Sequence, residues 1–238
     1  MEVGQEVEIF GEEAHHMMNV RRMRDGEEVK VQGPDHRRFR ATVTAIKRRS
    51  IALHIEGELK VPREPRVHLH LFQAATKEKM IDVILQKGTE LGLEAVHFFQ
   101  SEYSPYALKD SAAEKLERWN GITVEAAKQS DRAYWPSVEI ITDRVDLERR
   151  IMAMDHFYII DHAGKKSLAH MASEIPKLLG LSIGICIGPE GGLSEAELAY
   201  FGKFTNTVMT HLGPRTLRAS TAAPVAIALV QSILGDMQ

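Results

Sequence analysis

Apolar residues follow two different periods along the chain, and the change comes near residue 66. Before it they alternate with polar residues, as in RFRATVTAI at 38–46, where every second residue is apolar. This alternation is typical of strands with one buried face, and Gly-Pro-Asp at 33–35 indicates a turn between two strands. The pattern predicts a small β-domain over residues 1–66, with the Pro-rich stretch 62–65 as a linker.

From residue 67 onward, short apolar runs alternate with longer amphipathic stretches. Such runs are typical of buried strands, and the stretches are typical of helices that cover them. The predicted strands lie at 67–74, 93–99, 136–141, 156–161, 181–187 and 205–212. The predicted helices lie at 77–92, 111–130, 145–153, 167–179 and 221–237. This order predicts an α/β domain with a doubly wound parallel sheet over residues 67–238.

Several helix ends are marked by their chemistry. Gly92 is expected just after the C-cap of its helix, and Ser111 with Glu114 forms the Ser-x-x-Glu pattern of a capping box. We expect Pro224 in the first turn of the last helix, where a missing N–H is tolerated. That helix is apolar on most sides, so it should be buried in the domain or against a second subunit.

Composition limits the class of protein. The 238 residues are 44% hydrophobic and 26% charged, which is ordinary for a globular protein with a core. No apolar run reaches the roughly 18 residues of a membrane helix, and the acidic N-terminus lacks a signal-peptide pattern. The single cysteine, Cys186, lies within an apolar run. A single cysteine excludes an intramolecular disulfide, and its presence is typical of a protein in the reducing cytoplasm. We expect Cys186 to be a buried core residue.

The net charge of −3 conceals a basic segment. Residues 14–70 carry thirteen Lys and Arg against seven Asp and Glu, a balance of +6, and both flanking segments are acidic. A basic module attracts RNA phosphates regardless of sequence, but the same charges also suit solvent-exposed strand faces. Charge alone leaves both interpretations open. The close histidine pairs in this segment have no accompanying Asp, Glu or Cys cluster, so no metal site is predicted.

Two glycine-containing segments each follow a predicted strand. GPEGG at 188–192 precedes a helix start marked by the capping-box pair Ser194 and Glu197, and LGPRTLR at 212–218 precedes the last helix. Neither has the spacing of a phosphate-binding loop, and Glu190 would repel a phosphate. The residues leave two interpretations of GPEGG open: a tight turn, or a loop that binds a neutral or cationic ligand at the sheet edge.

Five segments together resemble one known family. IGPEGGLSEAEL at 187–198 and LGPRTLRASTA at 212–222 resemble motifs of the bacterial RsmE-type small-subunit rRNA uridine-N3 methyltransferases, members of the SPOUT superfamily. The segments 77–93, 125–138 and 15–29 are also similar to family segments. The matches cover nearly the whole chain in the family's order, which makes the resemblance far more specific than GPEGG alone.

The resemblance implies a PUA/OB-like β-barrel that binds RNA at 1–66 and an α/β knot with a threaded C-terminal segment at 67–238. S-adenosylmethionine would bind in the knot. The implied cofactor-binding residues are His162, Ile187, Gly188, Glu190, Gly191, Gly192, Leu212, Gly213, Leu217 and Arg218. The RNA-binding candidates are Arg21, Arg22, Arg24, Arg37 and Arg38. The resemblance also implies a homodimer through the knot helices and 16S rRNA of the small ribosomal subunit as substrate, with no metal and no membrane.

Methyl transfer to uracil N3 requires loss of the N3 proton. A cation beside the uracil oxygens would stabilise the resulting anion. Arg132, in the matching segment 125–138, is the first candidate for this role, and Arg218 is the second. No residue is assigned as the proton acceptor.

The chain departs from the family at two places that bear on the substrate. Ala219-Ser220-Thr221 stands where the family usually has Thr-Glu-Thr, and Glu102-Tyr103-Ser104 stands where it usually has Glu-Arg-Ser or Glu-Arg-Cys. Two alternatives therefore stay open beside the N3 methyltransferase. One is a SPOUT methyltransferase that acts on another RNA position, such as a tRNA ribose 2′-hydroxyl. The other is a non-catalytic RNA-binding or assembly protein.

Overall fold

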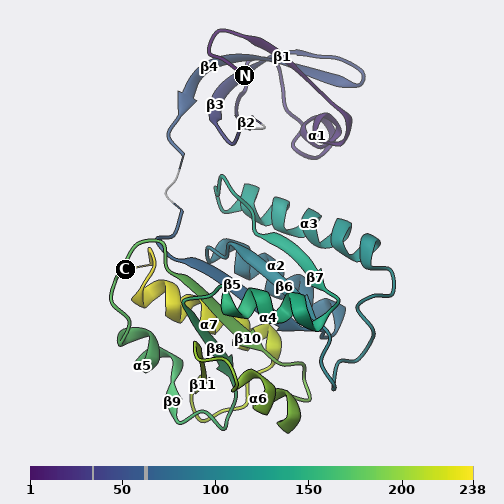
Figure 1. Ribbon diagram of the computed structural model, residues 1–238. Helices are drawn as coiled ribbons and strands as arrows, with labels where there is room; N and C mark the ends of the chain where they lie inside the picture. Colours follow the sequence, from purple (N-terminus) through teal and green to yellow (C-terminus); the bar gives the residue numbers. More distant parts are fainter. Residues whose placement is uncertain (34, 62–63, 238) are drawn as a thin grey trace. The chain divides into compact units, whose positions relative to one another are not determined.

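The computed structural model describes residues 1–33, 35–61 and 64–237, and the chain divides into two compact units, Met1–Arg63 and Glu64–Gln238 (Figure 1). Residue 34 of the predicted turn and residues 62 and 63 of the predicted linker lie outside the described residues. Each unit has its own hydrophobic core.

The first unit is built on an antiparallel sheet in the order β1-β4-β3-β2. Its strands are β1 (Glu6–Phe10), β2 (Glu28–Gln32), β3 (Arg38–Ile46) and β4 (Ser50–Leu59). The predicted alternation in β3 is confirmed, because its apolar residues point into the core with those of β4 while the residues between them are more exposed. The fully buried members of this core are Phe39, Ala41, Val43, Ile51, Leu53 and Ile55.

Two features of this unit differ from the predicted pattern. A short helix, α1 (Gly11–His15), and a π-helical segment (His16–Val20) follow β1, and they place Ala14 and Met17 in buried positions. So short a helical stretch carries too few turns to show a helical period in the sequence. Strand β4 continues without a break through Leu59, although Gly57 within it would favour a strand end.

The second unit is an α/β domain with an all-parallel seven-stranded sheet in the order β7-β6-β5-β10-β8-β11-β9. The strands are β5 (His68–Ala74), β6 (Ala95–Phe99), β7 (Ser137–Ile141), β8 (His156–Ile160), β9 (Lys166–Ser167), β10 (Ser182–Ile187) and β11 (Thr207–His211). The predicted parallel α/β fold is confirmed. Only the two-residue β9 was not predicted, because a bridge this short has no pattern of its own.

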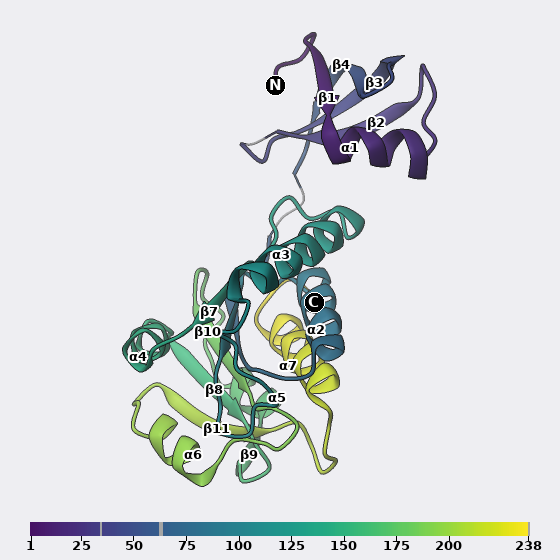
Figure 2. The ribbon, with the colours of Figure 1, turned by 90° about the vertical axis from the view of Figure 1, so that its right-hand side faces the viewer.

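Helices cover both faces of this sheet (Figure 2). One face carries α2 (Glu78–Glu90), α3 (Ala112–Gln129), α5 (Leu168–Ser173) and α7 (Ala219–Ile233). The other face carries α4 (Arg144–Met152) and α6 (Glu195–Phe201). The apolar α7 packs against α2, α5 and β10, as its composition predicts. Among the described residues, no helix is both long and apolar enough to cross a membrane.

Three local predictions are corrected by the structure. Ser111 precedes α3 in the left-handed region at φ 54° and makes no side-chain cap bond, so the capping box predicted with Glu114 is absent. Helix α7 begins at Ala219, which places Pro224 as its sixth residue, inside the helix and beyond its first turn. Helix α5 ends at Ser173, well before residue 179, because Pro176 cannot continue a helix. The expected cap at Gly92 is confirmed by its φ of +87°.

Candidate functional site

Three loops meet at one edge of the parallel sheet. The strands β10, β8 and β11 are neighbours in that order, so the loops that follow their carboxyl ends lie side by side. These loops contain His162, the GPEGG segment 188–192 and the segment 212–218. The carboxyl edge of a parallel sheet, at a point where the strand order is interrupted, is the usual ligand site of such domains. The structure therefore brings the sequence-predicted cofactor residues together.

The GPEGG loop is a tight turn that leads directly into α6. The N–H of Gly192 donates to the carbonyl of Pro189 at 2.9 Å, and Ser194 and Glu197 form the predicted capping box with both bonds present. Gly188 is closely packed, because a Cβ there would lie 3.1 Å from the carbonyl carbon of Gly192. The predicted geometry of a strand, a glycine turn and a capped helix is confirmed.

A buried glutamine on the neighbouring strand holds the start of this loop. Gln73 pairs in register with Ile187 and is 0% exposed. Its side-chain amide donates to the carbonyl of Ala74 at 2.9 Å and to those of Ile187 and Gly188 at 3.4 Å each. One side chain therefore fixes the point at which the chain leaves β10.

Glu190 is oriented toward the start of α2. Its carboxylate lies beside the Thr76 hydroxyl and the backbone N–H groups of Glu190 and Lys77. Burial raises the pKa of Glu190, but these neutral donors and the Lys77 charge outweigh it and hold the pKa below the ordinary glutamate value. The carboxylate thus links the middle of the GPEGG loop to the segment before α2.

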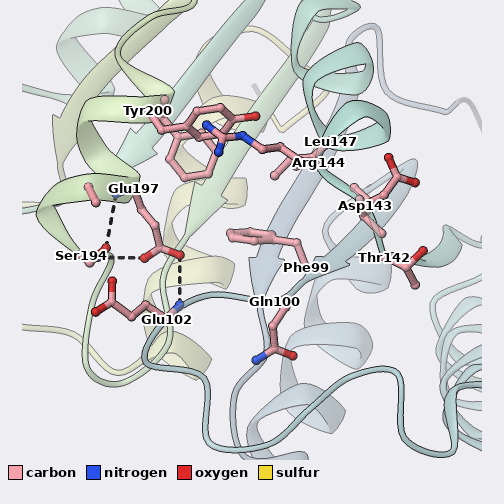
Figure 3. A pocket seen from close by; sticks show the side chains of 13 residues that line it. Phe99, Gln100, Glu102, Thr142, Asp143, Arg144, Leu147, Ser194, Glu197 and Tyr200 are labelled. Atoms are coloured by element: carbon pink, nitrogen blue, oxygen red, sulfur yellow. Dashed lines mark hydrogen bonds between the residues drawn. The ribbon is translucent and has the colours of Figure 1, made fainter.

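The loop after β6 packs against the GPEGG loop and the start of α6. The Glu197 carboxylate accepts a hydrogen bond at 3.1 Å from the Ser101 hydroxyl. Figure 3 shows its other bonds, one at 3.1 Å from the Glu102 N–H and the capping bond from the Ser194 N–H. The half-exposed Tyr103 lies against Gly191, where an added Cβ would come within 3.0 Å of the tyrosine Cβ. Tyr103, which stands where the family usually has arginine, is therefore beside the GPEGG loop.

The other two loops are also closely fitted. Gly213 has a φ of +105°, which favours glycine, and its N–H donates to Nδ1 of His211 at 3.0 Å. Gly164 packs on the backbone of β11, since a Cβ there would lie 2.5 Å from the carbonyl carbon of Thr210. His162 is exposed, and Leu212 and Leu217 are half-buried against the core.

The edge offers groups suited to an uncharged or cationic organic ligand. Two buried side-chain oxygens at strand ends, Oε1 of Gln73 and Oγ1 of Thr210, have no hydrogen-bond partner among the described residues. The loops bring backbone groups and the apolar side chains of Leu212 and Leu217 to the same place. In the part of the chain that the structure describes, no three His, Cys, Asp or Glu side chains gather to hold a metal ion.

The two catalytic candidates lie at different edges of the sheet. Arg218 is exposed and is the N-cap residue of α7, next to the loops. The Arg132 guanidinium donates to the carbonyls of Thr89 and Leu93 at 2.8 and 2.9 Å and pairs with Glu64 at 2.5 Å. Those carbonyls precede β6, at the amino edge of the sheet. Within one chain the structure does not bring Arg132 to the loops.

The RNA-binding candidates of the first unit have unequal exposure. Arg21, Arg22 and Arg24 are exposed on the segment before β2, and Arg22 has a φ of 50°. Arg37 forms a two-point ion pair with Glu58 on the sheet. Arg38 is only 7% exposed. The exposed arginines of this set that form no ion pair with a described residue therefore lie at positions 21–24. Part of the excess positive charge of the first unit is neutralised by carboxylates on the strands, as in the pair of Arg37 with Glu58.

A separate cavity of about 360 Å³ opens on the face of the sheet that α4 and α6 cover, between these two helices (Figure 3). It is lined by Phe99, Gln100, Glu102, Ile141, Thr142, Asp143, Arg144, Leu147, Ser194, Ala196, Glu197, Tyr200 and Phe201. It shares Ser194 and Glu197 with the helix start that follows GPEGG, but it contains none of the predicted cofactor residues.

The fold and this edge belong to a defined class of protein. Residues 62–231 match the RNA methyltransferase domain family, and residues 11–56 match the RNA methyltransferase PUA domain family. The chain therefore belongs to the RNA methyltransferase family that carries a PUA domain. The expected fold class, a parallel-sheet α/β domain that follows a PUA-like domain in the sequence, is confirmed.

Similar proteins share this organisation over nearly their full length. The ribosomal RNA small subunit methyltransferase E of Bacillus subtilis is 32% identical over 93% of this chain and 88% of its own. The Mycobacterium tuberculosis protein of the same name is 28% identical over 93% and 84%. A Neisseria gonorrhoeae structure of that enzyme, bound to S-adenosyl methionine, is 26% identical with a TM-score of 0.85, and the match covers 100% of this chain and 96% of that one.

Sequence reasoning missed the residues that support the loops from behind. Gln73 lies in β5, Thr76 lies between β5 and α2, and Ser101 follows β6. A sequence signal existed only for Gln73, a polar residue at the end of an apolar run. The contact of Thr76 with Glu190 joins residues more than a hundred positions apart, so no local pattern could indicate it.

Proposed function

We propose that this protein is an S-adenosylmethionine-dependent methyltransferase that modifies N3 of a uridine in 16S rRNA of the small ribosomal subunit, in the cytoplasm. One observation supports this most directly: three loops with the family's motifs lie together at the carboxyl ends of β10, β8 and β11. The names of the relatives support a small-subunit rRNA substrate.

The three loops fit the proposed cofactor. Gly188, Gly191 and Gly192 on one side and Gly213 on another allow the ligand to approach the backbone, where N–H and C=O groups can bind its polar atoms. Ile187, Leu212 and Leu217 supply apolar contacts for an adenine ring, and His162 closes the third side. When bound, S-adenosylmethionine supplies a methyl group on a sulfonium. Glu190 contributes by holding its loop against Thr76.

The protein's task is to orient uracil N3 toward that methyl group and to stabilise the anion left by loss of the N3 proton. Arg218 begins α7 at the edge of the loops, so its guanidinium can reach the uracil oxygens. Arg132 lies too far away in its own chain and can contribute only from a second copy. The proposed role of Arg132 is therefore tied to the homodimer.

A dimer through α7 would satisfy this requirement. The helix begins at the cofactor loops and ends near the amino edge, where Gln231 donates to the carbonyl of Gly92 at 3.1 Å. Antiparallel pairing of two α7 helices would bring the Arg132 region of one subunit toward the loops of the other. Val225 and Leu229, half-buried in one chain, are available for that interface.

The first unit is proposed to bind rRNA. Its exposed arginines Arg21, Arg22 and Arg24 can contact phosphates, and their contribution should fall with rising salt. Arg37 and Arg38 are weaker candidates for RNA binding than the other three predicted arginines, because Arg37 is paired with Glu58 and Arg38 is buried.

The test is methyl transfer from radiolabelled S-adenosylmethionine to small subunits that lack the modification, to naked 16S rRNA and to tRNA. The modified nucleoside is then identified by mass spectrometry. We expect 3-methyluridine in small subunits and much less in naked rRNA. Methylated tRNA ribose would replace the proposal with its first alternative. Cofactor binding without transfer to any of the three would favour a non-catalytic role.

A further inference from the structure

The cavity between α4 and α6 has the shape and chemistry of a site for a flat ligand. Its volume of about 360 Å³ falls within the roughly 300–1,000 Å³ of small-molecule pockets. Its floor is apolar, from Phe99, Ile141, Leu147 and Phe201. It opens at the carboxyl edge of the sheet, because Phe99 and Ile141 end β6 and β7.

One wall of the cavity is a preformed stack. The Cζ atom of Arg144 lies 3.8 Å from the ring centre of Tyr200, and Figure 3 shows the guanidinium over that ring, with Phe99 across the cavity. Glu148 holds both groups: it accepts from the Tyr200 hydroxyl at 2.8 Å and pairs with Nε of Arg144 at 3.5 Å. A wall that is already ordered loses little conformational entropy when a flat ring stacks on it.

The polar part of the lining selects against phosphate. Three carboxylates, Glu102, Asp143 and Glu197, line the cavity with a single guanidinium, that of Arg144. Glu197 is already occupied by Ser101, Glu102 and the capping bond. The carboxylate of Glu102 makes no hydrogen bond to another described residue, and one oxygen of Asp143 accepts only the N–H of Asp146. Carboxylates accept hydrogen bonds from the exocyclic amino groups of bases.

From these features we infer that the cavity is a second base-binding site, which takes a base with an exocyclic amino group, such as cytosine or adenine, of the RNA strand that carries the target. This inference rests on the proposed function for the source of the base. The base stacks on the wall of Arg144 and Tyr200, with its amino group toward Glu102 and Asp143, and the phosphates stay outside the acidic rim. Glu197 connects this cavity to the GPEGG loop, so an occupied cavity places the strand next to the cofactor site.

The first experiment measures nucleoside binding by NMR, with methyl labels on isoleucine and leucine, in the full chain with one equivalent of S-adenosylmethionine, because the adenine of a large excess would itself enter the cavity. Cytidine and adenosine should shift the Ile141 and Leu147 methyl signals saturably, and uridine should not. Ala196→Trp should abolish the shifts, because Ala196 is exposed and lines the cavity. Ala199→Trp is the matched control, since Ala199 is exposed on the same helix and does not line it.

The second experiment identifies the source of the base and uses short single-stranded oligocytidylate and oligouridylate. Ala196→Trp should weaken oligocytidylate binding about tenfold and leave oligouridylate unchanged, since stacking of one base is worth roughly 1–3 kcal/mol. A loss of nucleoside binding with unchanged oligocytidylate affinity would assign the site to a free nucleotide and overturn the RNA assignment. Neither measurement needs methyl transfer, so a failed transfer assay leaves this test intact. Equal shifts by uridine, or equal effects of both tryptophans, would also overturn the inference.

Discussion

The side-chain amide of Gln73 donates to the carbonyl oxygen of Gly188 at 3.4 Å, and this bond connects the end of β5 to the first residue of the GPEGG loop. The same amide also reaches the carbonyls of Ala74 and Ile187. Because Gln73 is fully buried, the loss of its side chain leaves the buried carbonyls without this donor. The shape of the proposed cofactor wall therefore depends on a residue behind it.

Replacing Gln73 by methionine, which has a similar length and no donor, should weaken cofactor binding. Three carbonyls lose a donor, at a cost of about 1–3 kcal/mol for each buried group left unsatisfied. We expect a lower melting temperature and a Kd for S-adenosylmethionine raised about tenfold by calorimetry. Unchanged cofactor affinity in a folded variant would show that the loop keeps its shape without this tether.

The contact between Glu190 and Thr76 should be measurable as an energetic coupling. Glu190→Ala and Thr76→Val each remove one side of the same contact, so their effects on cofactor affinity should not add. We expect a coupling of about 0.5–3 kcal/mol, the range for side chains in direct contact. Glu195→Ala, an exposed change on α6, serves as the control. Strict additivity would mean that the two side chains act independently in solution.

Gly164→Ala should disturb the third loop. The added Cβ would lie 2.5–2.8 Å from backbone atoms of Thr210, which cannot move as a flexible side chain would. Overpacking of this kind costs about 1–3 kcal/mol, seen as a lower midpoint in urea unfolding. Gly121→Ala is the opposite control: it lies within α3 with open space around it and should stabilise by about 0.5–1 kcal/mol.

Arg132→Ala separates catalysis from structure. If Arg132 acts on the substrate of a partner subunit, kcat should fall while the Kd for S-adenosylmethionine stays the same. The variant also leaves the Thr89 and Leu93 carbonyls without a donor, so a lower melting temperature is expected in either case. Glu64→Gln removes the ionic partner and keeps the arginine. An equal fall in kcat in both variants would reduce Arg132 to a structural residue.

His97 should make stability depend on pH. Burial, together with the nearby His70 and Arg150, lowers the pKa of His97 to about 3. The His97 side chain of the unfolded chain takes up a proton near pH 6.5, whereas that of the folded chain does not. The contribution of His97 to the free energy of unfolding is therefore fully present above pH 6.5 and is lost as the pH falls toward 3. Between pH 7.5 and 5.5 we expect a loss of about 1 kcal/mol from this residue in urea unfolding. His97→Gln should remove that part of the loss. An unchanged pH slope would assign it to other groups.

The amino-acid sequence by itself determined the local elements and the family. Short apolar runs and amphipathic stretches were sufficient for the strands and most of the helices of the second unit, because these patterns follow from the periods of strand and helix. The Ser194 cap was predictable since both of its partners lie within four residues. The same Ser-x-x-Glu pattern at Ser111 misled the prediction, because the backbone of Ser111 is left-handed and its side chain forms no cap bond.

Only the tertiary structure decided which loops meet. The insertion of β10 between β5 and β8 brings three strand ends together, and strand order depends on packing between distant segments. For the same reason, Arg132 and Arg218, the first and second catalytic candidates from the sequence, lie at opposite edges of the sheet. The sequence also carried no sign that Glu190 contacts Thr76 or that Arg144 stacks on Tyr200. Such contacts form only after the chain has folded, since they join residues that no local period relates.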